Sequence, residues 1–193
     1  LEAIVGRHAA DPRILAWDLC NEPFNCPEIT DADNAEYDWL AGIYDACKKL
    51  GAKAPITVGI SPAIPLARVE PISDLLSIHP YWVPDRPKAT KDAYEKSLDR
   101  DVAIALKANK PLLATETCWG SLDDRARVEL VRYTLEQLQK RNIGSLVYLL
   151  HHSLIADAHR PEFGPVGEPG NLAFIEADGS LRPGHDVYNE FCP

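Results

Sequence analysis

The sequence predicts an α/β fold with a parallel sheet, and two observations support this. Short apolar runs rich in strand-forming residues alternate with longer amphipathic stretches, which is the pattern of β-α units. The runs are apolar on both faces, as expected of parallel strands that helices cover on both sides. The chain has 193 residues, of which 46% are hydrophobic, so it can bury one sizeable core, and we expect one domain over residues 1–193.

Each element follows from a local pattern. Strands are predicted over residues 13–20, 54–61, 75–82, 110–119 and 144–153, and helices over residues 34–52, 90–110 and 122–144. Apolar residues recur at helical spacing in these helices, and Gly51 and Gly144 supply stops. Strands joined through helices in this order pair in parallel, with right-handed crossovers. In the tail, Asp178 and Gly179 predict a turn, and a short helix is expected from about Pro183.

Charge and hydropathy exclude several classes of protein. Lys and Arg number 20 against 29 Asp and Glu, a formal net charge of −9 that repels polyanions, so nucleic acid is not an expected partner. The sequence has no uncharged apolar run of about 18 residues and no basic stretch followed by an apolar one at its start, so we expect neither a membrane span nor a signal peptide. Because the chain starts at Leu1 and contains no methionine, we expect it to be a segment of a longer product.

The five cysteines are Cys20, Cys26, Cys47, Cys118 and Cys192. Their number is odd and no C-x-x-C pair occurs, so a zinc-type cluster is not supported. We expect small buried side chains rather than a disulfide framework, because a chain of this size does not need covalent staples.

Polar residues gather at the carboxyl ends of the predicted strands, the edge at which parallel α/β folds assemble their chemistry. Glu22 follows the first apolar run, and Glu116 lies near the end of the fourth. Two carboxylates at one edge of a sheet are what glycoside hydrolysis requires, since one protonates the leaving oxygen while the other attacks or stabilises the anomeric carbon.

Further side chains near these glutamates suit a sugar site. Asn21 supplies an amide able to bond a sugar hydroxyl. His79 and Tyr81 alternate at the end of the third run, so as strand residues they point the same way. Trp82 and Trp119 offer flat apolar surface on which a sugar ring can stack.

Three stretches carry a resemblance to a known family: W-D-L-C-N-E-P at residues 17–23, H-P-Y at 79–81 and T-E-x-x-x-G at 115–120. In this order they resemble the catalytic strands of clan A glycoside hydrolases, most closely the cellulase-like glycoside hydrolase family 5. The resemblance implies a (β/α)8 TIM barrel. It also implies that Glu22 is the acid/base and Glu116 the nucleophile.

The resemblance assigns the neighbouring residues as well. It makes Asn21 a partner of the sugar 2-hydroxyl, Tyr81 a hydrogen-bond partner of Glu116, and His79 a substrate-site residue. It starts just before the fourth strand of the family's barrel, so it implies an incomplete barrel of about five β-α units, strands four to eight. The strand at residues 13–20 is then an unpaired edge, and we expect either a missing N-terminal segment or a second copy of the chain to complete the barrel.

The function that these observations predict is retaining hydrolysis of β-linked glucan, mannan or related β-glycosides by a two-glutamate double displacement, with no cofactor and no metal. The alternative is a catalytically impaired barrel fragment that binds carbohydrate or assembles with itself. A weaker alternative is a metal-dependent hydrolase that uses His151, His152 and His159, which lack the spacing of a common metal motif. The family resemblance is compatible with a secreted or periplasmic protein, and the compartment stays open.

Overall fold

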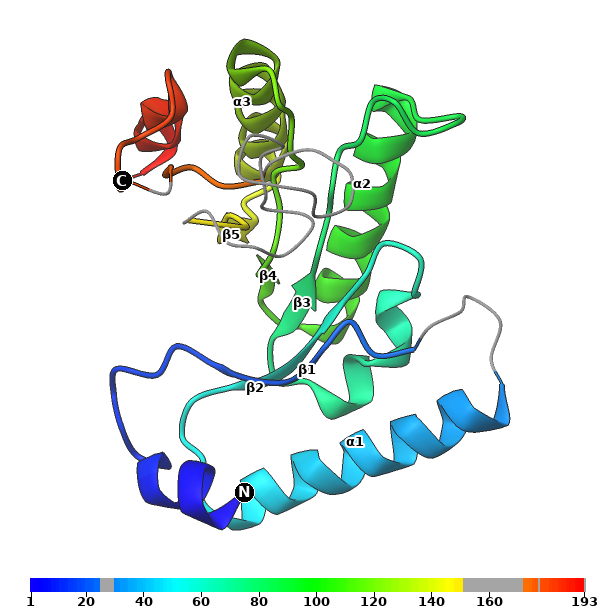
Figure 1. Ribbon diagram of the computed structural model, residues 1–193. Coiled ribbons are helices and arrows are strands. Elements are labelled where there is room, and N and C mark those ends of the chain that lie inside the picture. Colours follow the sequence, from blue (N-terminus) through cyan, green and yellow to red (C-terminus); the bar gives the residue numbers. More distant parts are fainter. Residues whose placement is uncertain (25–29, 151–171, 177, 193) are drawn as a thin grey trace. The chain divides into compact units, whose positions relative to one another are not determined.

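The computed structural model describes residues 1–24, 30–150, 172–176 and 178–192. Its strands are β1 (Trp17–Asn21), β2 (Ile56–Ile60), β3 (Leu76–Ile78), β4 (Leu112–Ala114) and β5 (Gly144–Ser145), in the sheet order β1-β2-β3-β4-β5. Its helices are α1 (Asp31–Lys49), α2 (Lys91–Ala108) and α3 (Asp124–Lys140), with short helices η1 (Glu2–Gly6), η2 (Leu66–Arg68), η3 (Glu70–Ile72) and η5 (His185–Phe191) (Figure 1). β1 pairs with β2, and β2 with β3, in parallel. The predicted α/β fold is confirmed, and its extension to an incomplete barrel stays a prediction.

The chain divides into two compact units. Unit 1 comprises Leu1–His79 with Arg100–Leu113, and unit 2 comprises Pro80–Asp99 with Ala114–Pro193. Among the described residues, no helix is both long enough and apolar enough to cross a membrane.

Unit 1 is built around β2, which is buried along its whole length. Cys47 of α1 packs with Val5 and Ile56 in the core, and α1 runs alongside β1 and β2 (Figure 1). α1 starts with a capping box in which Thr30 and Asp33 each bond the other's backbone N–H. A strand buried on both faces needs this helical cover, because it presents no polar face to water.

Asp74 fastens α1 to the sheet. Its carboxylate accepts hydrogen bonds from the Tyr44 hydroxyl at 2.8 Å, from Lys48 Nζ at 2.8 Å and from the backbone N–H of Ile56 at 3.0 Å. Burial by itself raises the pKa of Asp74, but these donors outweigh burial and leave it lowered. Burial, and then the bond to Asp74, raises the pKa of Tyr44 to about 12.

Unit 2 is held together by α3 and the tail that follows it in sequence. Val131, Leu135 and Leu138 form the buried face of α3. Arg182 in the tail is fully buried, and its guanidinium binds the Asp124 carboxylate at the start of α3 and the carbonyl oxygen of Ala173. A buried arginine is tolerated here because its donors meet a carboxylate and backbone carbonyls.

The strands are shorter than the sequence predicts, and this corrects one expectation. β3 ends at Ile78, so His79 and Tyr81 follow the strand instead of alternating along it. Pro80 gives the reason, because it has no backbone N–H to continue a ladder. Similarly, Glu116 lies beyond the end of β4.

The predicted turn in the tail is confirmed. Gly179 has φ +87°, and a bridge between Ile175 and Leu181 closes the hairpin around it. The closing helix is the 3-10 helix η5, which starts at His185, two residues later than expected. Among the described cysteines, Cys47 and Cys118 are buried as expected, whereas Cys20 is half-buried, Cys192 is exposed, and all four are free thiols. Cys26 lies outside the described residues.

Candidate active site

Glu22 stands at the carboxyl end of β1, in unit 1. Its backbone N–H bonds the carbonyl of Gly59 at 2.9 Å, and its φ of +48° lies in the left-handed region. Its Oε1 lies 2.8 Å from Nδ1 of His79, whose side chain is only 2% exposed, while that of Glu22 is 36% exposed. The contact with a buried imidazole fixes the position of this half-exposed carboxylate. Asn21, also predicted for the site, is exposed at the last position of β1.

Gly59 of β2 makes this arrangement possible. A Cβ at this position would stand 2.6 Å from Nε2 of His79 and 2.8 Å from Oδ2 of Asp18. The Gly59 N–H also donates to Oδ1 of Asp18 at 3.0 Å. Loss of water around Asp18 raises its pKa, although this bond acts in the opposite direction. Sequence analysis missed Gly59, and the available signal was a lone glycine inside an apolar strand, which often marks a close approach of other groups.

Glu116 stands beyond β4, in unit 2. The Tyr81 hydroxyl donates to its Oε1 at 2.5 Å, and the Tyr81 ring meets the Trp119 ring edge to face, with centroids 5.5 Å apart. The Thr117 hydroxyl donates to the Pro80 carbonyl at 3.0 Å and so ties the two strand-end loops together. The structure therefore places Tyr81 against Glu116, the arrangement that the family resemblance implies.

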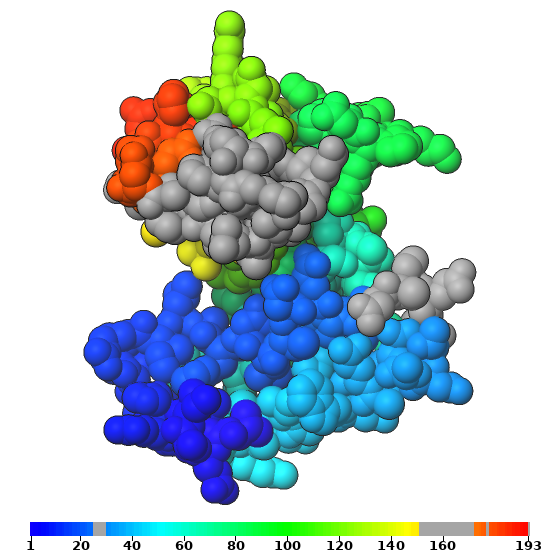
Figure 2. Space-filling model, viewed as in Figure 1, coloured from blue at the N-terminus to red at the C-terminus, as the bar shows by residue number. Residues whose placement is uncertain are grey.

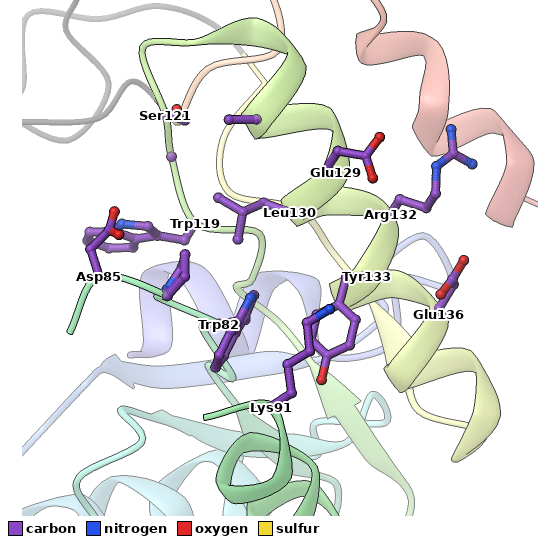
Figure 3. A pocket seen from close by; sticks show the side chains of 13 residues that line it. Trp82, Asp85, Lys91, Trp119, Ser121, Glu129, Leu130, Arg132, Tyr133 and Glu136 are labelled. Atoms are coloured by element: carbon purple, nitrogen blue, oxygen red, sulfur yellow. The ribbon is translucent and has the colours of Figure 1, made fainter. Parts of the chain in front are cut away.

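Trp82 does not lie open to solvent as a sugar platform. Only 9% of it is exposed, because its ring packs against Tyr94 and Tyr133, at centroid distances of 5.8 and 5.7 Å. It nevertheless contributes one wall of a pocket of about 580 Å³ in unit 2 (Figure 3). The pocket is lined by Trp82, Pro84, Asp85, Lys91, Trp119, Gly120, Ser121, Ala126, Glu129, Leu130, Arg132, Tyr133 and Glu136.

Cys118 lies among these residues in sequence but is no candidate nucleophile. It is fully buried, and burial raises its pKa to about 12, so the thiol stays protonated at neutral pH. Burial likewise lowers the pKa of the neighbouring Arg127 to about 10.

The predicted site residues fall into two sets. Unit 1 brings Glu22 and His79 together, and unit 2 brings Tyr81, Glu116 and Trp119 together. The separation of the two glutamate carboxylates, which belong to different units, stays a prediction. The histidines considered for a metal ion, His151, His152 and His159, lie outside the described residues.

Comparison with known proteins indicates where this fold occurs. No protein-family profile matches the chain, and no curated protein matches it. Among solved structures, it resembles a β-glucuronidase of Faecalibacterium prausnitzii at TM-score 0.72 and 17% identity, over 98% of this chain and 34% of that one. It resembles a GH2 β-galacturonidase of Eisenbergiella tayi at TM-score 0.68 and 16% identity, over 95% and 34%. The fold is one that glycoside hydrolases use.

A third similar structure comes from a different kind of enzyme. The endo-β-1,4-mannanase of Thermotoga petrophila matches at TM-score 0.66 and 17% identity, over 95% of this chain and 44% of that one. By comparison, the chain spans about a third of the length of the β-glucuronidase and β-galacturonidase structures. At these identities the similarity establishes the fold, and substrate and mechanism must be argued from the site.

Proposed function

We propose that this chain carries the catalytic residues of a retaining β-glycoside hydrolase that acts on β-linked glucan, mannan or related β-glycosides. One observation carries the proposal: each of two strand-end glutamates is held by a dedicated side chain. His79 contacts Glu22 at 2.8 Å, and Tyr81 donates to Glu116 at 2.5 Å. Glutamates that serve only as solvated surface charges do not need such partners.

The proposed reaction has two steps. Glu116 attacks the anomeric carbon while the Glu22 carboxyl gives its proton to the leaving oxygen, which yields a glycosyl-enzyme ester. Glu22, now ionised, then takes a proton from water, and the resulting hydroxide attacks the anomeric carbon. This breaks the ester, releases the sugar, and returns Glu116 as a carboxylate and Glu22 as the protonated acid. This chemistry requires the two carboxyl groups to lie about 5 to 5.5 Å apart, whereas an inverting enzyme needs a wider gap.

The choice of family and substrate rests on different arguments. The N-E-P, H-P-Y and T-E-x-x-x-G stretches favour an enzyme similar to glycoside hydrolase family 5. The solved structures with this fold include a β-glucuronidase, a β-galacturonidase and an endo-β-1,4-mannanase, all of which are named for β-linked substrates. We therefore propose a β-linked substrate. Because of the three sequence stretches, we propose that this substrate is more similar to that of the mannanase than to a glucuronide or galacturonide.

Covalent labelling tests the proposal. Incubation with an activated fluoroglycoside should add the mass of one glycosyl group, and peptide mapping should find it on Glu116. Glu116→Gln should abolish the adduct, and Glu22→Gln should slow its formation with poor leaving groups. A label on another residue would overturn the assignment of Glu116.

A second candidate function is carbohydrate binding without turnover. Binding of a β-linked oligosaccharide together with no adduct and no hydrolysis would support this candidate over the hydrolase.

A further inference from the structure

The loop that follows β1 is held in a backbone conformation that its residues do not favour. Glu22 and Phe24 have φ of +48° and +70°, in the left-handed region that non-glycine residues seldom adopt. Glu22 also precedes Pro23, and a residue before proline is ordinarily extended. Such a conformation persists only where the surrounding structure supplies enough contacts to fix it.

Two side chains of unit 1 supply these contacts at Phe24, which is only 3% exposed. The Glu36 carboxylate of α1 accepts a hydrogen bond from the Phe24 backbone N–H at 2.9 Å. The Arg68 guanidinium of η2 lies over the Phe24 ring, with its Cζ 4.0 Å from the ring centroid. A hydrogen bond to a carboxylate is stronger than one between neutral groups, and a cation over an aromatic face adds to it. Phe24 is therefore held both by its backbone and by its ring.

Glu36 also lies near the end of β1. Burial raises the pKa of the Cys20 thiol, and the charge of Glu36 raises it further. The register of β1 against β2 shifts by one residue between Asp18 and Asn21, an irregularity that re-aims the side chains after it. The direction of Glu22 is therefore set by contacts around the strand end and not by the ladder alone.

Pro23 connects the held residue to Glu22. Its ring fixes φ close to about −65°, and the residue is buried. Because one of the two backbone torsions of Pro23 is fixed, the segment between Phe24 and Glu22 has little freedom to rotate. A displacement of Phe24 would therefore move the Glu22 carboxylate out of its 2.8 Å contact with Nδ1 of His79.

We propose that Glu36 and Arg68 are positioning residues for the acid/base: by holding Phe24, they fix the direction in which Glu22 meets the leaving group. The inference rests on the proposed hydrolase function and adds to it two residues that act through Phe24 and not on the reacting atoms. Loss of either side chain should impair proton donation by Glu22 and spare the attack by Glu116.

Amide hydrogen exchange, measured by NMR, tests the backbone contact without turnover. In Glu36→Ala the Phe24 N–H loses its acceptor and should exchange at least about tenfold faster than in the unchanged chain. Glu36→Gln keeps an acceptor oxygen and should stay within about threefold of the unchanged rate. Asp38→Ala removes an exposed carboxylate from the same helix and is the matched control, with no change expected. An unchanged Phe24 rate in Glu36→Ala would overturn the proposal.

The choice of leaving group shows whether the contact serves Glu22. Phenyl β-cellobioside needs a proton on its leaving oxygen, whereas the dinitrophenolate of 2,4-dinitrophenyl β-cellobioside departs without one. In Glu36→Ala, kcat/KM should fall by about 10 to 100-fold for the phenyl substrate and by less than about threefold for the dinitrophenyl substrate. Arg68→Ala should lower kcat/KM for the phenyl substrate alone, by about threefold. Glu36→Gln should restore most of the phenyl activity.

The outcomes separate the positioning role from the function on which it rests. Equal falls of kcat/KM for both substrates, or no fall for either, would overturn the positioning role, because a general loss of structure does not depend on the leaving group. The hydrolase function fails in a different way, through the absence of both turnover and an adduct on Glu116 in the unchanged chain. An adduct on Glu116 together with equal falls removes the positioning role alone.

Discussion

Gly59 leaves the space in which His79 and Asp18 meet the carboxyl end of β2. The imidazole of His79 reaches Glu22 only because no side chain stands between it and the strand, since a Cβ would lie 2.6 Å from Nε2. The position of Glu22, the proposed acid/base, thus depends on the absence of a Cβ at Gly59 in the neighbouring strand β2.

We predict that Gly59→Ala destabilises unit 1 and weakens the contact between His79 and Glu22. The overpacking should cost about 1 to 3 kcal/mol in the free energy of unfolding, measured by urea denaturation. Gly42→Ala in α1 is the matched control, because its Cβ meets nothing within 4 Å and alanine favours the helix. Equal stability of the two variants would contradict this role for Gly59.

The Tyr81 hydroxyl is expected to hold Glu116 in place for attack. Tyr81→Phe keeps the ring contact with Trp119 and removes only the donor, so kcat for an aryl β-glycoside should fall by about 10 to 100-fold. Tyr188→Phe is the control, since that hydroxyl donates to the backbone carbonyl of Ser145 instead. An unchanged kcat in Tyr81→Phe would show that the bond does not serve the reaction.

At the scale of elements, η5 is fixed to unit 2 through a histidine that stays neutral when folded. His185 is 1% exposed, its ring meets Phe174 edge to face, and its Nε2 has no hydrogen-bond partner among the described residues. Burial lowers its pKa to about 4.

Burial of neutral His185 predicts that the folded chain loses stability in mild acid. As pH falls from about 6.5 to 4, the unfolded chain binds a proton on His185 that the folded chain does not, so the free energy of unfolding should drop by up to about 3 kcal/mol. His185→Phe should flatten this part of the pH profile, as followed by urea unfolding at several pH values. An unchanged slope in His185→Phe would show that this histidine does not set the pH dependence.

The elements also show how far local pattern determines structure. The predicted helix 34–52 corresponds to α1, and 122–144 to α3, because apolar periodicity and caps are local properties of the sequence. The strand ends were predicted less well, since the predicted strand 75–82 stops at Ile78 in β3. Strand length depends on ladder partners that lie far away in sequence.

At the scale of the whole molecule, the sheet order leaves β1 at one end. Among the described residues, β1 pairs only with β2, and its other edge offers N–H and C=O groups to a further strand. Leu15, in the segment that leads into β1, is 65% exposed, and the residues around it (blue in Figure 2) form part of the surface. Exposed apolar residues beside an open sheet edge favour association.

We therefore expect the chain to self-associate through this edge of β1. Size-exclusion chromatography with light scattering should show a mass that rises towards a dimer with concentration. Leu15→Lys should shift the equilibrium towards the monomer. A monomer at every concentration would contradict self-association through the edge of β1.

The sequence by itself determined the α/β class, the helices and the strand-end positions of Glu22 and Glu116, because periodicity and residue type are local. It also supported the pairing of Tyr81 with Glu116, through the family resemblance. Only the tertiary structure showed that Gly59 makes room for His79, that Trp82 is buried, and that Trp82 and Trp119 line a pocket in unit 2. These depend on which side chains from distant segments share one volume, and packing of that kind is fixed by the folded chain and by no single stretch of sequence.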